Sequence, residues 1–163
     1  MPLGVKFNTK IKGESYYDST WMRPRRLRIK QEIIKYLEEN NLPFKDFGCY
    51  DNSSVDYPIY ARKVTDAITH GECDKGILIC GTGIGISIAA NKVPGIRAAL
   101  CTDCFCAEAT RHNDANILCM GGRVVGPGLA VKITDTFLNT PFSNDERHIR
   151  RINLIENRDP SEN

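Results

Sequence analysis

A cysteine and three glycines stand together in CGTGIG, residues 80–85, and this combination suits proton transfer on a carbonyl compound. The glycines allow backbone N–H groups to converge on an anion or an oxyanion, and a helix that begins there adds the attraction of its dipole. The same amides would stabilise a Cys80 thiolate, which can act as a nucleophile or as a general base. The pattern is neither a G-x-G-x-x-G turn nor a Walker loop. The alternatives are an ordinary strand–helix corner and a buried core cysteine.

An imidazole and a side-chain amide follow in RHNDAN, residues 111–116, at the end of a predicted helix. His112 is of the residue type that gives and takes protons near neutral pH, and Asn113 can hydrogen-bond a sugar hydroxyl. Taken alone, His112 is equally well explained as a helix cap or a surface residue.

Arginines gather near the C-terminus in ERHIRR, residues 146–151. Arg147 and Arg151 lie four positions apart, so on a helix they share a face and can hold one phosphate, whereas Arg150 points elsewhere. The alternative is a salt-bridged basic helix end. Together with the thiol, the imidazole and the glycine loop, these arginines fit proton-transfer chemistry on a small phosphorylated metabolite.

Strands and helices alternate in the segments that must position these residues. The continuous apolar runs KGILIC, GIRAALC and NILCMGG predict strands buried on both faces, and LPFKDFG, residues 42–48, predicts a further short strand. Helices are predicted over residues 28–39, 56–71, 103–112, 126–139 and 145–156. This order predicts an α/β, Rossmann-like, three-layer fold with an open parallel sheet and helices on both faces. In such folds, ligands bind beyond the carboxyl ends of the strands.

Two helices have apolar faces that we expect to be buried. The first helix would bury Ile29, Ile33, Tyr36 and Leu37, and the last would bury Ile149, Ile152 and Ile155.

Composition indicates an ordinary globular protein of one domain. The 163 residues are 41% hydrophobic and 26% charged, and the formal net charge of +2 argues against wholesale binding of nucleic acid. No apolar run approaches the roughly 18 residues that span a membrane, and the N-terminus lacks the apolar region of a secretory signal. We therefore expect a cytoplasmic protein with no membrane partner.

Seven cysteines, an odd number, lie scattered among apolar residues. The cluster CTDCFC has a C-x-x-C spacing, but no second Cys/His pair completes a zinc site. We expect most of these cysteines to be buried thiols.

Five stretches together make the chain resemble the type B ribose-5-phosphate isomerases, in a sugar-phosphate isomerase family that also includes galactose-6-phosphate isomerase. They are VDYP, GILICGTGIGISIAANKVPGIRAALC, HNDANIL, GGRVVGPGLA and RHIRR. The resemblance covers about residues 29–156 and is most specific around Cys80. It implies a cofactor-free and metal-free interconversion of ribose 5-phosphate and ribulose 5-phosphate through a cis-enediolate.

The resemblance also implies roles for individual residues. Cys80 would move the proton between C1 and C2, and His112, with help from Thr82, would open the furanose ring. The backbone amides of Gly81, Thr82, Gly83, Ile84 and Gly85 would stabilise the enediolate, and Asn113, Arg123, Arg147 and Arg151 would bind the substrate. A homodimer or homotetramer is implied, with each site built across an interface.

The N-terminal segment departs from the family, which begins with an apolar strand and an Asp-His-Ala/Gly loop that contacts substrate. The positions of Asp-His are here Arg23 and Pro24, and the helix before His112 is one residue shorter than is usual in the family. Codons exist for residues 16–30 that, read one nucleotide later, give IMIALGCDHAGFGL, a family-like strand and loop. We hypothesise that the residues before about Ile29 are read out of frame. A nucleotide sequence that cannot encode Asp-His in the shifted frame would exclude this.

The predicted organisation is therefore an aberrant segment over residues 1–28, an isomerase domain over 29–157 and a polar tail over 158–163. Two alternative functions stay open. The chain could be a phosphosugar-binding relative that has lost the Asp-His loop and with it part of its activity. The arginine-rich segment 23–28 could contact nucleic acid, although no recognisable binding module accompanies it.

Overall fold

The computed structural model of the protein describes residues 23–48 and 56–157. The predicted N-terminal segment before residue 23, Cys49 and the predicted tail 158–163 lie outside the described residues. The elements are α1 (Arg23–Glu39), α2 (Tyr57–Thr69), β1 (Gly76–Cys80), α3 (Ile84–Ala90), β2 (Ala98–Leu100), α4 (Cys104–Ala109), the 3-10 turn η1 (Thr110–His112), β3 (Ile117–Gly121), α5 (Pro127–Asn139) and α6 (Glu146–Glu156). The predicted alternation of strands and helices is confirmed.

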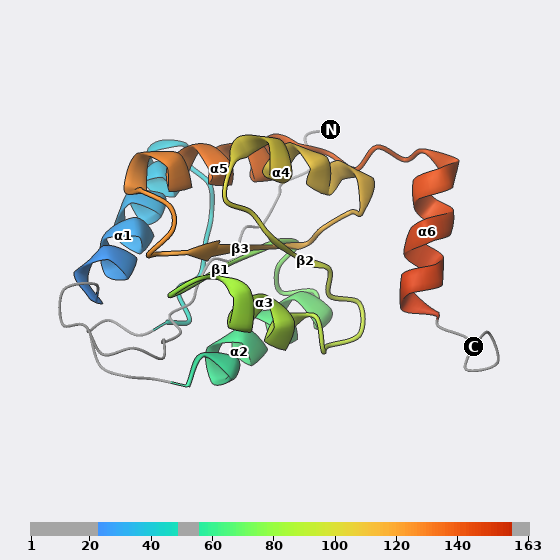
Figure 1. Ribbon diagram of the computed structural model, residues 1–163, viewed down its shortest axis with the longest axis horizontal. Coiled ribbons are helices and arrows are strands. Elements are labelled where there is room, and N and C mark those ends of the chain that lie inside the picture. Colours follow the sequence, from blue (N-terminus) through green and yellow to red (C-terminus); the bar gives the residue numbers. More distant parts are fainter. Residues whose placement is uncertain (1–22, 49–55, 158–163) are drawn as a thin grey trace.

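The three strands form a parallel sheet in the order β1-β3-β2, with β3 in the middle (Figure 1). Cys80 at the end of β1 lies beside Gly121 at the end of β3, so the carboxyl ends of these two strands meet at one edge. Every residue of β1 and β3 is buried, as their continuous apolar runs predicted. The same prediction is wrong for β2, the edge strand, whose residues are partly buried or exposed.

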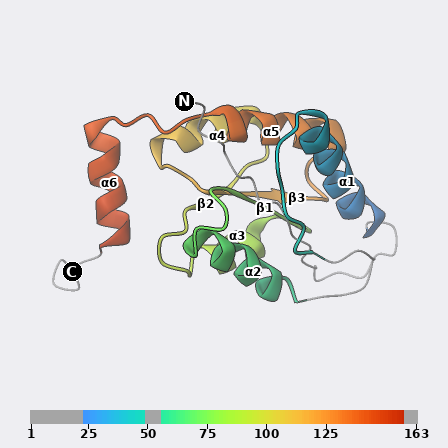
Figure 2. The ribbon, with the colours of Figure 1, turned by 180° about the vertical axis from the view of Figure 1, so that it is seen from behind.

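Helices cover both faces of the sheet, which confirms the predicted three-layer α/β arrangement (Figures 1 and 2). Because successive strand residues point to opposite faces, each strand supplies both layers of the core. Ile77, Ile79, Leu118 and Met120 pack with α1, α4 and α5. Leu78, Cys80, Ile117 and Cys119 pack with α2 and α3. Cys80 therefore belongs to the α2/α3 side of the core.

The first helix begins at Arg23, which is five residues before the predicted start at Arg28. Pro24 is compatible with this early start, since proline lacks only an N–H group that has no partner in the first turn of a helix. Arg23 and Pro24, the positions of the family's Asp-His loop, are therefore the first residues of a helix. The predicted inward face is confirmed, with Ile29, Ile33 and Leu37 at most 2% exposed and Tyr36 packed against them.

The strand predicted over residues 42–48 is wrong, because this segment is irregular. Its apolar side chains are partly buried: Leu42 and Phe44 pack on one core cluster and Phe47 on the other. The apolar residues of LPFKDFG therefore contribute to the core although the segment does not form a regular strand.

The last helix, α6, stands apart from the layers at one end of the molecule (Figures 1 and 2). The predicted burial of its apolar face is wrong for the single chain: Ile149 and Ile155 are 42% and 59% exposed, and Ile152 is partly exposed. The periodicity did predict a helix, but the described residues supply no layer against which this face packs.

The edge strand β2 is paired on its outer side by a side chain. The Asn91 side-chain amide donates to the Ala98 carbonyl oxygen and accepts from the Ala98 N–H, both at 2.8 Å. Asn91 ends α3, so this pair also fixes the loop between α3 and β2.

Within residues 23–48 and 56–157, no helix is both long and apolar enough to cross a membrane. Four cysteines in this part of the chain are buried, namely Cys73, Cys80, Cys101 and Cys119, whereas Cys106 is exposed and Cys104 is intermediate. The prediction that most cysteines are buried is thus confirmed for four of the six described.

Candidate active site

Cys80 is the last residue of β1, and its thiol lies against the glycine loop that follows. Its side chain is nearly buried, at 4% exposure, and its sulfur accepts a hydrogen bond of 3.1 Å from the Gly83 N–H. Cys80 therefore combines the two interpretations that the sequence left open: its sulfur meets a backbone amide of the glycine loop, and its side chain packs in the core.

The loop is attached by backbone hydrogen bonds to the residues that follow β3. The Cys80 carbonyl accepts from the Gly122 N–H at 2.8 Å, and the Gly81 carbonyl accepts from the Arg123 N–H at 3.0 Å. Gly121 packs so closely on this loop that a Cβ there would lie 2.6 Å from the Thr82 carbonyl oxygen. The structure therefore brings the predicted substrate residue Arg123 beside the Cys80 loop.

Two glycines of the loop have no room for a side chain. Gly83 has φ +83°, and a Cβ there would lie 2.9 Å from the backbone carbon of Met120 and would also clash with Leu100. A Cβ on Gly85 would lie 2.6 Å from the Tyr57 hydroxyl oxygen. The loop is thus closely packed between β3, β2 and α2, and this packing holds its amides in place before any ligand arrives.

Thr82 and Ile84 are the exposed residues of this loop. The Thr82 hydroxyl accepts from the Ile84 N–H at 3.4 Å, so it lies at the start of α3. Ile84 and Ile88, one turn apart on α3, are 53% and 56% exposed. An apolar surface therefore adjoins the loop that carries Cys80.

His112 ends the 3-10 turn η1 and stacks on a second histidine from α6. The ring centroids of His112 and His148 are 4.6 Å apart, and His148 Nδ1 lies 2.7 Å from the Ser143 hydroxyl. His148 is only 6% exposed. Burial lowers the pKa of His148 below its usual range, and the positive charge of Arg147 adds to this effect. No role was predicted for His148 from the sequence, although it lies between the two predicted phosphate arginines.

A cavity of about 450 Å³ opens beside these two histidines. Its polar lining comes from α4, η1, the connection between α5 and α6, and α6 itself, and includes Arg111, His112, Ser143, Asp145, Arg147 and His148. Arg147 pairs with Asp145, with Nε 3.0 Å from the carboxylate, and Asp145 caps α6 by accepting from the Arg147 N–H at 3.1 Å. That backbone hydrogen bond lowers the pKa of Asp145. Arg151 follows one turn later and is exposed.

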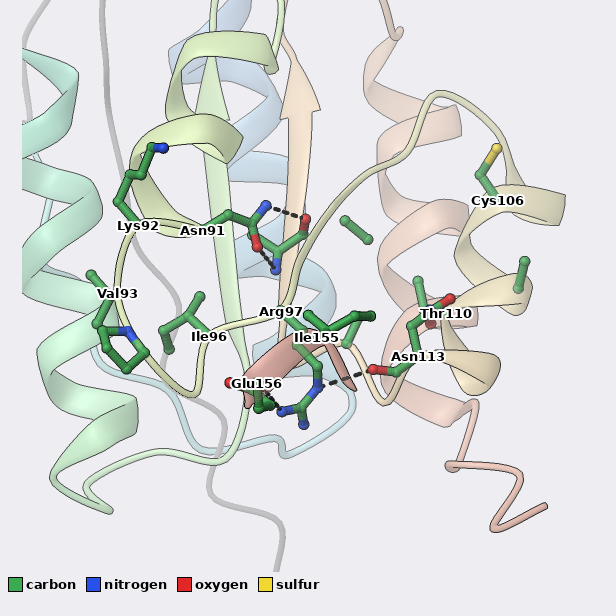
Figure 3. A pocket seen from close by; sticks show the side chains of 15 residues that line it. Asn91, Lys92, Val93, Ile96, Arg97, Cys106, Thr110, Asn113, Ile155 and Glu156 are labelled. Carbon is green, nitrogen blue, oxygen red and sulfur yellow. Dashed lines mark hydrogen bonds and ion pairs between the residues drawn. The ribbon is translucent and has the colours of Figure 1, made fainter. Parts of the chain in front are cut away.

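Asn113 lies on the other side of the same turn and lines a second cavity of about 750 Å³ between α4, the loop after α3 and the end of α6 (Figure 3). Arg97 crosses this cavity toward Asn113 and Glu156. Arg97 is the other residue to which the sequence assigned no role, although it lies within the stretch GIRAALC, because its partners are distant in the sequence.

The predicted site residues therefore form two groups in the chain. The first group consists of Cys80, the loop 81–85 and Arg123. The second group consists of His112, Asn113 and Arg147, with Arg151 further along α6. Cys80 lines neither the cavity beside His112 nor the cavity beside Asn113. The first group offers a base and oxyanion donors, and the second offers proton transfer and anion binding.

No group of three or more His, Cys, Asp and Glu side chains in the described ranges is arranged to hold a metal ion. Of the CTDCFC cysteines, Cys101 is buried, which raises its pKa to about 12. The exposed Cys106 donates to the Asp103 carboxylate at 3.3 Å, and this hydrogen bond raises the Cys106 pKa.

Comparison with known proteins gives a consistent result. The sequence model of the family described as Ribose/Galactose Isomerase matches residues 25–155. Ribose-5-P isomerase B of Listeria innocua is 47% identical over 129 residues, which are 78% of this chain and 86% of that protein. Ribose-5-phosphate isomerase B of Escherichia coli K12 is 46% identical over 128 residues, which are 78% of this chain and 85% of that protein. The solved structure of Clostridium thermocellum ribose-5-phosphate isomerase B has a TM-score of 0.79 and 47% identity, and the match covers 91% of this chain and 95% of the other.

Proposed function

Because this chain belongs to the ribose/galactose isomerase family, and is thus an isomerase, we propose that it interconverts ribose 5-phosphate and ribulose 5-phosphate. The observation that carries the proposal is the Cys80 thiol at the end of β1, hydrogen-bonded by the Gly83 amide inside a closely packed glycine loop. This placement suits a base that acts between two adjacent carbon atoms.

In the proposed reaction, the Cys80 thiolate takes the proton from C2 of the open-chain aldose. The electron pair of the C2–H bond forms the C1–C2 double bond, and negative charge develops on O1, which gives a cis-enediolate. The amides of Gly81, Thr82, Gly83, Ile84 and Gly85 surround this charge, as an oxyanion hole does. The proton then returns to C1 while the O2 hydroxyl proton moves to O1, which yields the ketose.

We assign the second group of residues, together with Thr82 and Arg123 of the first, to the sugar ring and the phosphate. His112, assisted by Thr82, opens the furanose by proton transfer. Asn113 and Arg123 bind the sugar, and Arg147 and Arg151 hold the phosphate with charge-assisted hydrogen bonds. His148, which belongs to α6, packs on the ring of His112 and so holds His112 in place.

The separation of the two groups leads to a proposal about assembly. A second copy of the chain would supply His112, Asn113 and α6 to the Cys80 loop of the first, so that each site spans an interface. The apolar surfaces fit this arrangement: Leu154 and Ile155 on α6 are 58% and 59% exposed, and Ile84 and Ile88 lie beside the Cys80 loop. Covering such surfaces favours association. The smallest assembly would be a homodimer, and a homotetramer would contain the same interface twice.

A mixing experiment tests function and assembly together. Cys80→Ala and His112→Ala chains should each be inactive in converting ribose 5-phosphate to ribulose 5-phosphate. When they are unfolded and refolded together, half of the dimers are mixed and each has one intact site, so activity should recover to about a quarter of wild type. Absence of recovery would place all groups of a site in one chain. Turnover that survives Cys80→Ala would overturn the mechanism.

The alternative of a phosphosugar-binding relative rests on the N-terminal departure, since α1 begins where the family's Asp-His loop would stand. Binding of ribose 5-phosphate without turnover by the wild-type chain would favour it.

A further inference from the structure

Arg97, in the loop between α3 and β2, connects two elements of the candidate site that are far apart in the sequence. Its Nε donates to the carbonyl oxygens of Asn113 and Asp114, at 3.0 and 2.8 Å. Its Nη2 donates to the Asp114 carboxylate at 2.8 Å, and its Nη1 donates to the Glu156 carboxylate at 2.9 Å. The side chain is 19% exposed, so these charge-assisted bonds are partly shielded from water. Figure 3 shows the guanidinium between the turn and the end of α6.

The first element is the turn that follows His112. Asp114 has φ +47°, in the left-handed region that non-glycine residues rarely adopt. Arg97 binds both the carbonyl and the carboxylate of Asp114, and so it stabilises this conformation. Asn116 adds two bonds of 2.8 Å: it accepts from the Arg97 N–H and donates to the Gly95 carbonyl. The direction of the chain at His112 and Asn113 therefore depends on Arg97.

The second element is α6, which is attached to this turn at both ends. At its C-terminal end, Glu156 accepts from Arg97 and, at 3.3 Å, from the Gly95 N–H. At its N-terminal end, His148 stacks on His112. Arg151 lies between these attachments and Arg147 directly precedes His148, on a helix that otherwise stands apart from the layers (Figure 2).

We propose that Arg97 is a positioning residue, which through Asp114 and Glu156 holds the His112 turn and the arginines of α6 in one fixed arrangement. The inference rests on the proposed isomerase function and adds to it the Arg97–Glu156 pair, which does not touch the substrate in this proposal. Since α6 is exposed along most of its length, loss of its C-terminal attachment would leave the two arginines free to move relative to His112.

Glu156→Gln tests the attachment of α6, because it keeps the size of the side chain and removes its charge. We expect the KM for ribose 5-phosphate and the Kd of inorganic phosphate, measured by calorimetry, to rise together by about fivefold, while kcat changes less than about twofold. Glu72→Gln is the matched control, since it breaks the Lys45–Glu72 pair, which is also 2.9 Å long. It should leave both constants unchanged.

Arg97→Lys tests the turn, because lysine keeps the charge but cannot reach several acceptors at once. We expect kcat from ribose 5-phosphate to fall about tenfold. Exchange of the C1 proton of ribulose 5-phosphate with D2O should stay within about twofold, since this acyclic ketose requires no ring opening. In the double variant with Glu156→Gln, KM should rise no further than in Arg97→Lys alone, because the two residues act as one unit.

Circular dichroism and thermal unfolding identify the variants that fold. If Glu156→Gln does not fold, Glu156→Asp replaces it, because the shorter side chain moves the carboxylate away from Arg97. Unchanged phosphate affinity and KM in a folded Glu156 variant would overturn the inference, as would additive effects in the double variant. A wild-type chain that binds phosphate without turnover would refute only the proposed function. The phosphate Kd of the Glu156 variants would then still decide the role of Glu156. A wild-type chain that binds no phosphate would refute the inference.

Discussion

The Cys80 loop and α6 carry different parts of the candidate site and are built in opposite ways. The loop is enclosed: its backbone is bonded to the residues after β3, and neighbouring atoms occupy the space beside Gly83 and Gly85. Helix α6 is attached near its two ends, through His148 and Glu156, and leaves Leu154 and Ile155 exposed.

This difference separates two tasks. An enclosed loop suits the proposed base and its amides, because groups fixed before substrate arrives need little reorganisation during the reaction. A projecting helix is suited to bring arginines to another surface, here proposed to be a second copy. The two regions should therefore respond differently to mutation, with chemistry lost in the first and phosphate affinity lost in the second.

Cys80→Ala should give the largest effect and should confine it to chemistry. We expect kcat for ribose 5-phosphate to fall about a thousandfold, the range for loss of a general base, with phosphate affinity preserved. Steady-state kinetics and phosphate calorimetry measure the two quantities. Cys106→Ala, at an exposed cysteine on α4, is the control and should keep wild-type turnover. Equal loss of phosphate affinity in Cys80→Ala would show that the two regions are not separable.

Gly83→Ala tests whether the loop is as rigid as its packing indicates. Strain at φ +83° and the clash with the Met120 backbone should lower the free energy of unfolding by about 3 kcal/mol. Gly95→Ala is the matched control, since Gly95 has φ +78° but open space around its Cβ position. It should lose only about 1 kcal/mol. Urea unfolding measures both, and equal losses would mean that the clash relaxes without cost.

Arg147→Ala and Arg151→Ala test the helix. Each should raise the Kd of inorganic phosphate about tenfold through loss of a charge-assisted hydrogen bond, with C1 proton exchange at saturating ribulose 5-phosphate little changed. Arg150→Ala removes the same charge from the same helix and should change the Kd less than about twofold. If all three variants weaken binding alike, general positive charge rather than a paired site holds the phosphate.

Acid should weaken the N-terminal attachment of α6 by a small amount. The folded pKa of His148 lies below 6.5, so the unfolded chain binds the proton more tightly and stability falls as pH drops through and below 6.5. The thermal unfolding midpoint measured between pH 8 and pH 5.5 should therefore decline more steeply for wild type than for His148→Gln. His70→Gln, at the exposed end of α2, should keep the wild-type slope. Parallel slopes for wild type and His148→Gln would contradict this account.

The sequence predicted the enclosed region better than the projecting one. Continuous apolar runs identify β1 and β3 because strands buried on both faces have no polar alternation. The glycines after Cys80 mark the loop because closely packed backbone leaves no room for side chains. The grouping of Arg123 with Cys80 was not predicted, because it depends on the pairing that places the end of β3 beside the end of β1.

The errors arise where structure depends on contacts distant in the sequence. Periodicity showed that α6 is amphipathic but not what covers Ile149 and Ile155. The sequence around Arg97 does not reveal its role, because its acidic partners lie 17 and 59 positions away. Likewise, LPFKDFG has the composition of a strand, but a strand requires a neighbour that local sequence does not specify.

The pair between Asn91 and Ala98 has a consequence for solubility. A sheet edge with unpaired N–H and C=O groups recruits strands from other chains, which leads to aggregation. At the edge of β2, the amide of Asn91 imitates one residue of such a strand and occupies both groups of Ala98. A single side chain therefore blocks intermolecular strand pairing at Ala98, the first residue of this three-residue edge strand.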